Sequence, residues 1–116
     1  MNHIDFVLKN VKFNYFKNEN YNKKLVFAEL KKYYTFVYAP QDHVTLGIPD
    51  ILFQNGGGMF CAIEVKMNGK NWSKHWPLQE RNLKIIGVKG FAWLLEILID
   101  NTYDLKEHYN DNFNKV

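Results

Sequence analysis

Hydrophobic positions follow two different spacings along the chain, and the first segment fits both of them. Over residues 3–16, apolar residues recur at every second position and also at helical spacing, so strand and helix both remain open here. Over residues 20–34, apolar residues recur at three- and four-residue intervals, which predicts an amphipathic helix. The residues of this second stripe are Leu25, Val26, Leu30 and Tyr33.

Four short runs of β-branched and aromatic residues predict strands. The first covers residues 35–39 and is stopped by Pro40, because proline cannot continue a strand ladder. The others are expected at residues 50–54, 60–66 and 91–97, with a glycine-rich turn at residues 55–58.

A second helix is expected to begin at Pro77, since proline suits the first helical turn, and to end near Val88 before Gly90. Polar residues 102–112 predict a last helix. The order helix, three strands, helix, strand predicts one α/β domain with a mixed central sheet. Its core is expected over about residues 19–97, preceded by an N-terminal extension of residues 1–18.

Composition narrows the class of protein. The chain has 116 residues, of which 47% are hydrophobic and 23% charged, as in a single globular domain rather than a disordered chain. No run of about 18 uncharged apolar residues predicts a membrane span. The first residues do not resemble a signal peptide, and the single cysteine, Cys61, excludes an internal disulfide and a cysteine-based zinc site. We therefore expect a cytoplasmic protein with Cys61 buried as a small apolar residue.

Charge is distributed unevenly around a net value of +3. Residues 1–41 and 66–89 are basic, whereas residues 42–65 and 96–116 are acidic. Basic segments that flank an acidic one suit a protein that attracts a polyanion and holds cations in the middle. A solvated, lysine-rich surface is the plainer interpretation.

The informative segment is a pair of acids around the glycine turn. The midpoint between Asp50 and Glu64 is Gly57, the central glycine of the turn. A symmetric hairpin therefore places the two acids opposite each other, with Cβ atoms roughly 4.5–5.5 Å apart. Opposed like charges repel, and a shared divalent cation such as Mg²⁺ removes that cost.

Lys66 follows Glu64 by two residues, so both side chains face the same side of a strand. A lysine there can orient or deprotonate an attacking water, or hold a phosphate oxygen. The residues between are expected to point into the core on the opposite face: Ile51, Phe53, Ile63 and Val65. Taken singly, Asp50, Glu64 and Lys66 also fit ordinary turn and surface positions.

Two sequence runs, Gly47-Ile48-Pro49-Asp50 and Ala62-Ile63-Glu64-Val65-Lys66, resemble the PD-(D/E)xK nuclease superfamily. Within it, they are most similar to the small VRR-NUC-type and phage Holliday-junction-resolvase-like nucleases. The resemblance covers about residues 19–97 and includes Pro77-Leu78-Gln79 and Gly90-Phe91-Ala92-Trp93. It implies a restriction-endonuclease-like core.

The resemblance also implies roles for individual residues. Asp50 and Glu64 would bind Mg²⁺, with Mn²⁺ as a substitute and the Val65 carbonyl as a third ligand. Lys66 would position or activate the attacking water, and Gln79 would lie beside the site. For the acid that the family carries on its first helix, Glu19 is our first choice and Glu29 the rival.

The resemblance further implies that residues 68–76 form a DNA-facing loop, in which aromatic and basic side chains together can stack on bases and hold phosphates. The candidates are Lys70, Trp72, Lys74 and Arg81. The alternative, equally weighted, is that this loop tucks Trp72 and Trp76 into the core. Isolated histidines, namely His43, His75 and His108, do not predict a zinc site.

The sequence therefore predicts a Mg²⁺-dependent endonuclease that hydrolyses phosphodiester bonds in double-stranded or branched DNA. Symmetric cleavage of a branch favours a homodimer. Small size and a lysine- and asparagine-rich composition suit a phage or mobile element acting in a bacterial host. The alternatives are a non-catalytic nucleic-acid-binding or assembly module that retains the nuclease fold, and an α/β domain without a site.

Overall fold

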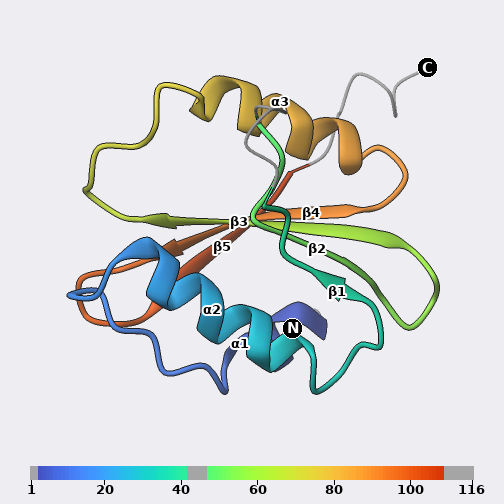
Figure 1. Cartoon of the computed structure of the whole chain (residues 1–116), viewed down its shortest axis with the longest axis horizontal. Helices are drawn as coiled ribbons and strands as arrows, with labels where there is room; N and C mark the ends of the chain where they lie inside the picture. The colour runs from blue at the N-terminus through green and yellow to red at the C-terminus, as the bar shows by residue number, and fades with distance from the viewer. Residues whose placement is uncertain (1–2, 42–46, 109–116) are drawn as a thin grey trace.

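The computed structural model of the chain describes residues 3–41 and 47–108. It is an α/β structure in which a five-stranded sheet lies between helices (Figure 1). The helices and strands, in chain order, are α1 (His3–Leu8), α2 (Glu19–Leu30), β1 (Val37–Tyr38), β2 (Ile51–Gln54), β3 (Phe60–Met67), α3 (Trp76–Ile86), β4 (Phe91–Ile97) and β5 (Tyr103–His108).

The strands lie in the sheet in the order in which they occur in the chain. Neighbouring strands are antiparallel except β3 and β4, which are parallel because α3 carries the chain across the sheet between them. Helix α3 covers one face and α1 with α2 the other, as Figure 1 shows. The predicted α/β class and mixed sheet are confirmed.

The turn between β2 and β3 is fixed by Asn55 at its start. Its side-chain oxygen accepts hydrogen bonds from the backbone N–H groups of Gly57 and Met59, at 3.0 and 2.9 Å. An asparagine that bonds to the backbone two residues on is a common turn-forming device. The predicted turn and the two strands beside it are thus confirmed, with the strands one residue shorter or longer than expected.

Helix α2 begins where Asn18 caps it, since the Asn18 side chain accepts from the Tyr21 N–H at 2.8 Å. The helix ends at Leu30, four residues before the predicted end. Val26 and Leu30 are buried, whereas Tyr33 lies beyond the helix and is 41% exposed. The apolar side of α2 is therefore shorter than the stripe predicted over residues 20–34.

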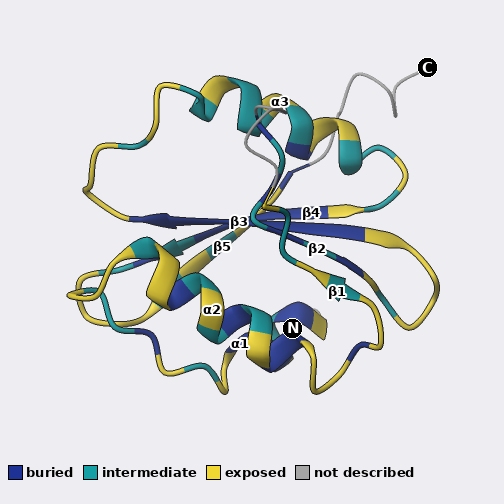
Figure 2. Ribbon diagram, viewed as in Figure 1, coloured by how far each residue is buried: buried dark blue, intermediate teal, exposed yellow. Residues whose placement is uncertain are grey.

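Most of the core lies between the sheet and α1 with α2. Figure 2 shows the central strands buried along most of their length. Residues expected in this core, including Ile51, Phe53, Ile63 and Val65, are all fully or almost fully buried. A smaller cluster on the α3 face joins Leu83 to Ala62 and Ala92.

One expectation was wrong. Residues 103–108 form strand β5 instead of a helix, because Tyr103 and Leu105 pack on the core while the residues between face outwards, and β5 pairs with β4. The rest of that predicted helix, residues 109–112, lies outside the described residues. Within the N-terminal extension, Ile4, Val7 and Leu8 of α1 are buried in the main hydrophobic core.

Gly90 precedes β4 at a point where no side chain fits. A Cβ at this position would lie 2.1 Å from the Phe60 carbonyl oxygen. This contact lets β4 begin close against β3. No helix in the two described stretches has both the length and the apolar character to cross a bilayer.

Candidate active site

The candidate site lies on the hairpin of β2 and β3, at the end of their pairing that is farther from the connecting turn. The last paired residues of the two strands are Ile51 and Ile63, and one step further Asp50 lies opposite Glu64. The Asp50 N–H donates to Glu64 Oε1 at 3.1 Å, and the Val65 N–H donates to Asp50 Oδ2 at 2.8 Å. The hairpin thus brings the two acids together as its symmetry predicts.

Lys66 joins this pair from the same face of β3. Its Nζ lies 3.3 Å from Glu64 Oε2, and both side chains are almost completely buried, at 3% and 1% exposure. Among the residues that the structure describes, the Lys66 ammonium is the one partner of Glu64 Oε2, which has no hydrogen bond of good geometry. A buried carboxylate oxygen with so few partners is unusual and suits a further ligand.

Burial is the main cause that raises the pKa of Glu64, to about 8, and the neighbouring Asp50 charge raises it further. The Lys66 ammonium opposes this shift, while the Glu19 charge adds to it. The pocket therefore disfavours a free carboxylate at Glu64 and favours either a proton or a cation there.

Helix α2 supplies two more charged groups at its first turns. Glu19 is close enough to Lys66 and Asp50 to be influenced by both, although burial is the main cause that raises its pKa. Lys23, one turn later, places its Nζ 3.7 Å from Asp50 Oδ1. The rival acid, Glu29, lies about 15 Å further along the helix and pairs with Lys32 at 3.0 Å. The structure thus brings Glu19, not Glu29, to the site.

The loop before Asp50 is held against α3. Gly47 has a φ of +79°, and a Cβ there would lie 2.7 Å from Leu78 Cγ. The Gly47 carbonyl accepts a hydrogen bond of 2.9 Å from Asn82. Glycine is therefore required both for the backbone conformation and for the close approach, and this packing fixes where Asp50 begins β2.

Helix α3 turns Gln79 towards the sheet. Trp76, one turn before Gln79, has its ring centroid 5.7 Å from Lys66 Nζ, and Leu83, one turn after it, belongs to one buried cluster with Ala62. Side chains three and four residues apart share a helix face, so Gln79 lies on the face of α3 that is turned towards β3. Its buried Oε1 has no hydrogen-bond partner among the residues that the structure describes.

These groups suit a hard divalent cation. Mg²⁺ prefers oxygen ligands and retains several waters, and two carboxylates are a usual protein contribution. The N–H and C=O of a strand residue point to the same edge, so the Val65 carbonyl faces the side where Asp50 lies. Within residues 3–41 and 47–108, no three Asp, Glu, His or Cys side chains group closely enough to hold a metal alone. Asp50, Glu64, the Val65 carbonyl and water would therefore have to share it.

The predicted DNA-facing residues follow β3 at the same end of the sheet. Lys74 and Arg81 are exposed, and Lys70 lies over the Tyr15 ring at 5.2 Å. Trp72 is half-buried, donates to the Met67 carbonyl at 3.1 Å and packs edge-on against Trp76. The two tryptophans are thus neither fully exposed nor part of the main core.

Two residues of the site were not assigned to it from the sequence. Lys23 follows Glu19 by four residues, which places both on one face of α2, and this spacing was the available signal. Trp76 was considered only as a loop residue, although its place beside Pro77 at the start of α3 points it towards Lys66.

The remaining candidates lie elsewhere. His43 is outside the described residues, His75 precedes α3, and His108 is buried 3.6 Å from Glu80. Cys61 is fully buried, and burial raises its pKa to about 11, so the thiol stays protonated as a small apolar group.

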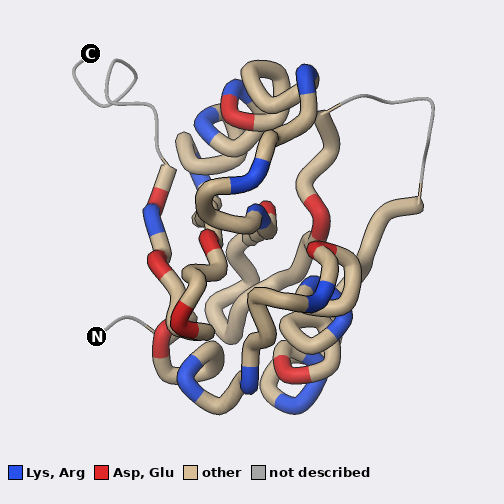
Figure 3. Tube along the Cα trace, turned by 90° about the vertical axis from the view of Figure 1, so that its left-hand side faces the viewer, with Lys and Arg blue, Asp and Glu red and all other residues tan. Residues whose placement is uncertain are grey.

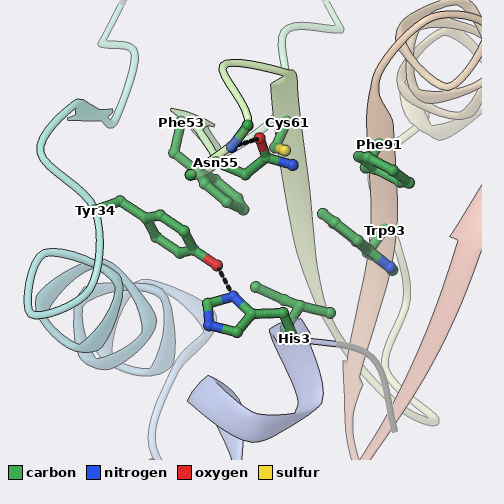
Figure 4. A pocket seen from close by; sticks show the side chains of 10 residues that line it. His3, Tyr34, Phe53, Asn55, Cys61, Phe91 and Trp93 are labelled. Atoms are coloured by element: carbon green, nitrogen blue, oxygen red, sulfur yellow. Dashed lines mark hydrogen bonds between the residues drawn. The ribbon is translucent and has the colours of Figure 1, made fainter.

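A separate pocket of about 400 Å³ lies at the other end of β3 and β4, on the face covered by α1 and α2 (Figure 4). Aromatic rings of Tyr34, Phe53, Phe91 and Trp93 line it, and the Tyr34 hydroxyl is hydrogen-bonded to the His3 ring. The described lining contains no carboxylate, so this pocket is not part of the candidate metal site.

Charged residues of both signs lie on the elements around the site (Figure 3). Helix α2 carries two lysines and two glutamates, α3 carries Arg81 and Lys84 with Glu80, and the edge strand β5 carries Asp104 and Glu107 with Lys106.

No model of a known family matches the chain, and neither a curated protein nor a solved structure is significantly similar to it. We therefore infer function from the geometry of the site.

Proposed function

We propose that the protein is a divalent-metal-dependent nuclease that hydrolyses phosphodiester bonds in DNA. One observation carries the proposal: Asp50 and Glu64 are held side by side by hydrogen bonds from the Asp50 and Val65 N–H groups, and the buried Glu64 Oε2 has only the Lys66 ammonium beside it among the described residues. Burying an acid beside another acid is costly, and a bound cation reduces that cost.

The residues divide the chemistry between them. A bound Mg²⁺ would supply positive charge to the transition state and lower the pKa of water. Asp50 and Glu64 would hold it, with Glu19 as a further acid nearby. Lys66 would orient the attacking water or hold a phosphate oxygen, and Gln79 would bond to the same water or phosphate.

Cleavage assays test this proposal. Wild-type protein is expected to cut DNA with Mg²⁺ or Mn²⁺ but not with EDTA, and Glu64→Gln and Asp50→Asn are expected to reduce cutting at least 100-fold while the circular dichroism spectrum is unchanged. Linear, supercoiled, single-stranded and four-way-junction DNA should be compared.

Glu107→Gln is the matched control, because Glu107 is exposed on the edge strand β5, which β4 separates from the acid pair on β2 and β3. It should cut like the wild type. Undiminished cleavage by purified Glu64→Gln protein would refute the assignment.

A rival function has a specific observation in its favour. Lys66 and Lys23 already lie within ion-pair distance of Glu64 and Asp50, so the acids are neutralised in part without a metal. A binding or assembly module would need no more than this. Such a module would bind DNA without binding Mn²⁺, which a calorimetric titration distinguishes.

Cleavage of branched DNA is the narrower form of the proposal. Symmetric incision requires two active sites related by a two-fold axis, and hence a dimer. Light scattering at the assay concentration should give twice the mass of the 13.8 kDa chain. The mass of a single chain would exclude symmetric cutting of a junction by a stable dimer.

A further inference from the structure

A groove of about 620 Å³ opens between α2 and β1, next to the candidate site. One wall consists of Asn20, Lys23, Lys24 and Phe27, which lie along one side of α2, and the other consists of residues 37–41. Lys23 belongs to both places, because it lines the groove while its Nζ lies 3.7 Å from Asp50. The groove therefore runs on from the acid pair.

The lining combines positive charge with aromatic surface. Among the described residues of the lining, the charged ones are Lys23 and Lys24, and Lys24 is exposed. Tyr38 is 52% exposed at the edge of the sheet, and Phe27, which is half-buried on α2, also lines the groove. Lysines beside exposed aromatic rings are the combination that binds single-stranded nucleic acid, because lysines hold phosphates and rings stack on bases.

An exposed ring distinguishes unpaired from paired nucleotides. Bases within a duplex are already stacked on each other, and only splayed or single-stranded bases are free to stack on a protein ring. Tyr38 would therefore contribute nothing to holding an intact duplex. An extended peptide added to the edge of β1 is the rival occupant, but the charges in the described lining of the groove are positive, which favours a polyanion.

We infer that the α2–β1 groove binds unpaired nucleotides next to the bond that is cleaved, with Tyr38 stacking on a base and Lys24 holding a phosphate. The reference to the cleaved bond rests on the proposed function, whereas the binding does not. The preferred substrate is then DNA with a single-stranded segment beside the scissile bond, such as a flap, a gap or a splayed end.

Fluorescence anisotropy in EDTA tests this inference without any cleavage. The probes are a fluorescein-labelled oligothymidine of 12 nucleotides and a blunt hairpin duplex. Tyr38→Ala is expected to weaken oligothymidine binding 5- to 100-fold, as loss of a base–aromatic stack does, and duplex binding less than twofold. Tyr38→Phe should retain wild-type affinity, and Lys24→Ala should reduce the salt dependence by about 0.7 in log–log slope.

Two controls match these variants. Phe36 is a similarly exposed aromatic residue two positions before Tyr38 but does not line the groove, and Lys89 is exposed between α3 and β4. Phe36→Ala and Lys89→Ala should bind oligothymidine like the wild type.

Three results would show that the inference is wrong. Tyr38→Ala could bind oligothymidine with wild-type affinity, or it could lose affinity for oligothymidine and duplex equally. Polyglutamate of equal charge could also compete for the groove as well as oligothymidine does. Tyr38-dependent binding by a protein that never cuts would support the groove and refute the nuclease.

Discussion

At the scale of single residues, Glu64 is the least explained by folding alone. It is 1% exposed and lies against Asp50, and its Oε2 has no hydrogen bond of good geometry among the described residues. Buried charges in proteins are normally paired or bound to metal. Lys66 supplies one partner at 3.3 Å, and the remaining cost is what we attribute to the binding of a cation.

The raised pKa of Glu64 predicts how stability changes with pH in EDTA. The folded protein keeps the Glu64 proton up to about pH 8, whereas the unfolded chain releases it near 4.5. Because the unfolded state binds fewer protons between these values, the free energy of unfolding falls as pH rises. Glu64→Gln has no proton to lose, so its free energy of unfolding should decrease less over the same pH range.

Urea unfolding at pH 5.5 and pH 8 measures this difference. Between these pH values, the free energy of unfolding of the wild type should decrease by at least about 1 kcal/mol more than that of Glu64→Gln. Glu107→Gln, the exposed control, should behave like the wild type. An identical pH dependence for wild type and Glu64→Gln would show that Glu64 titrates normally.

At the scale of helices and strands, the hairpin was predictable and the edge of the sheet was not. The glycine turn sets the register, and the register alone places Asp50 opposite Glu64. Residues 103–108 are polar enough for an exposed helix, and only pairing with β4 makes them a strand. Choosing Glu19 over Glu29 likewise requires the placement of α2 on the sheet, which the local sequence does not contain.

Gly47 offers a test of how α3 positions Asp50. Gly47→Ala should lower stability by about 1–3 kcal/mol, because alanine is strained at a φ of +79° and its Cβ would meet Leu78. Because the loop must shift, Mn²⁺ binding should weaken as well. Chemical denaturation and calorimetry measure the two effects.

Gly56→Ala is the matched control, since a Cβ at Gly56 has no neighbour within 4 Å. Its stability should stay within about 0.5 kcal/mol of the wild type. If Gly47→Ala were as stable as Gly56→Ala and bound Mn²⁺ equally well, the loop would not be held as described.

At the scale of the whole molecule, the N-terminal segment belongs to the folded unit. Helix α1 packs against α2 and contributes three buried side chains to the main core. The sequence alone did not decide between a strand and a helix here, because the apolar residues fit both spacings. Packing against the core favours the helix. The site is thus supported from both faces of the sheet, by α2 on one side and α3 on the other.

Leu8→Ala tests that support. Leu8 is fully buried, so its truncation should cost about 2–5 kcal/mol in the free energy of unfolding. Ile99→Ala removes a comparable side chain that is 66% exposed and should cost less than about 1 kcal/mol. If both variants lost the same small amount of unfolding free energy in urea, α1 would be a dispensable extension.

The central claim is that Asp50 and Glu64 share one divalent cation, and calorimetric titration of Mn²⁺ into the full chain tests it most directly. Wild type and Glu107→Gln should bind one ion per chain, more tightly as pH rises towards 8 because the ion displaces the Glu64 proton. Asp50→Asn and Glu64→Gln should each abolish that binding. No binding by wild type, or equal binding by all four proteins, would contradict the account.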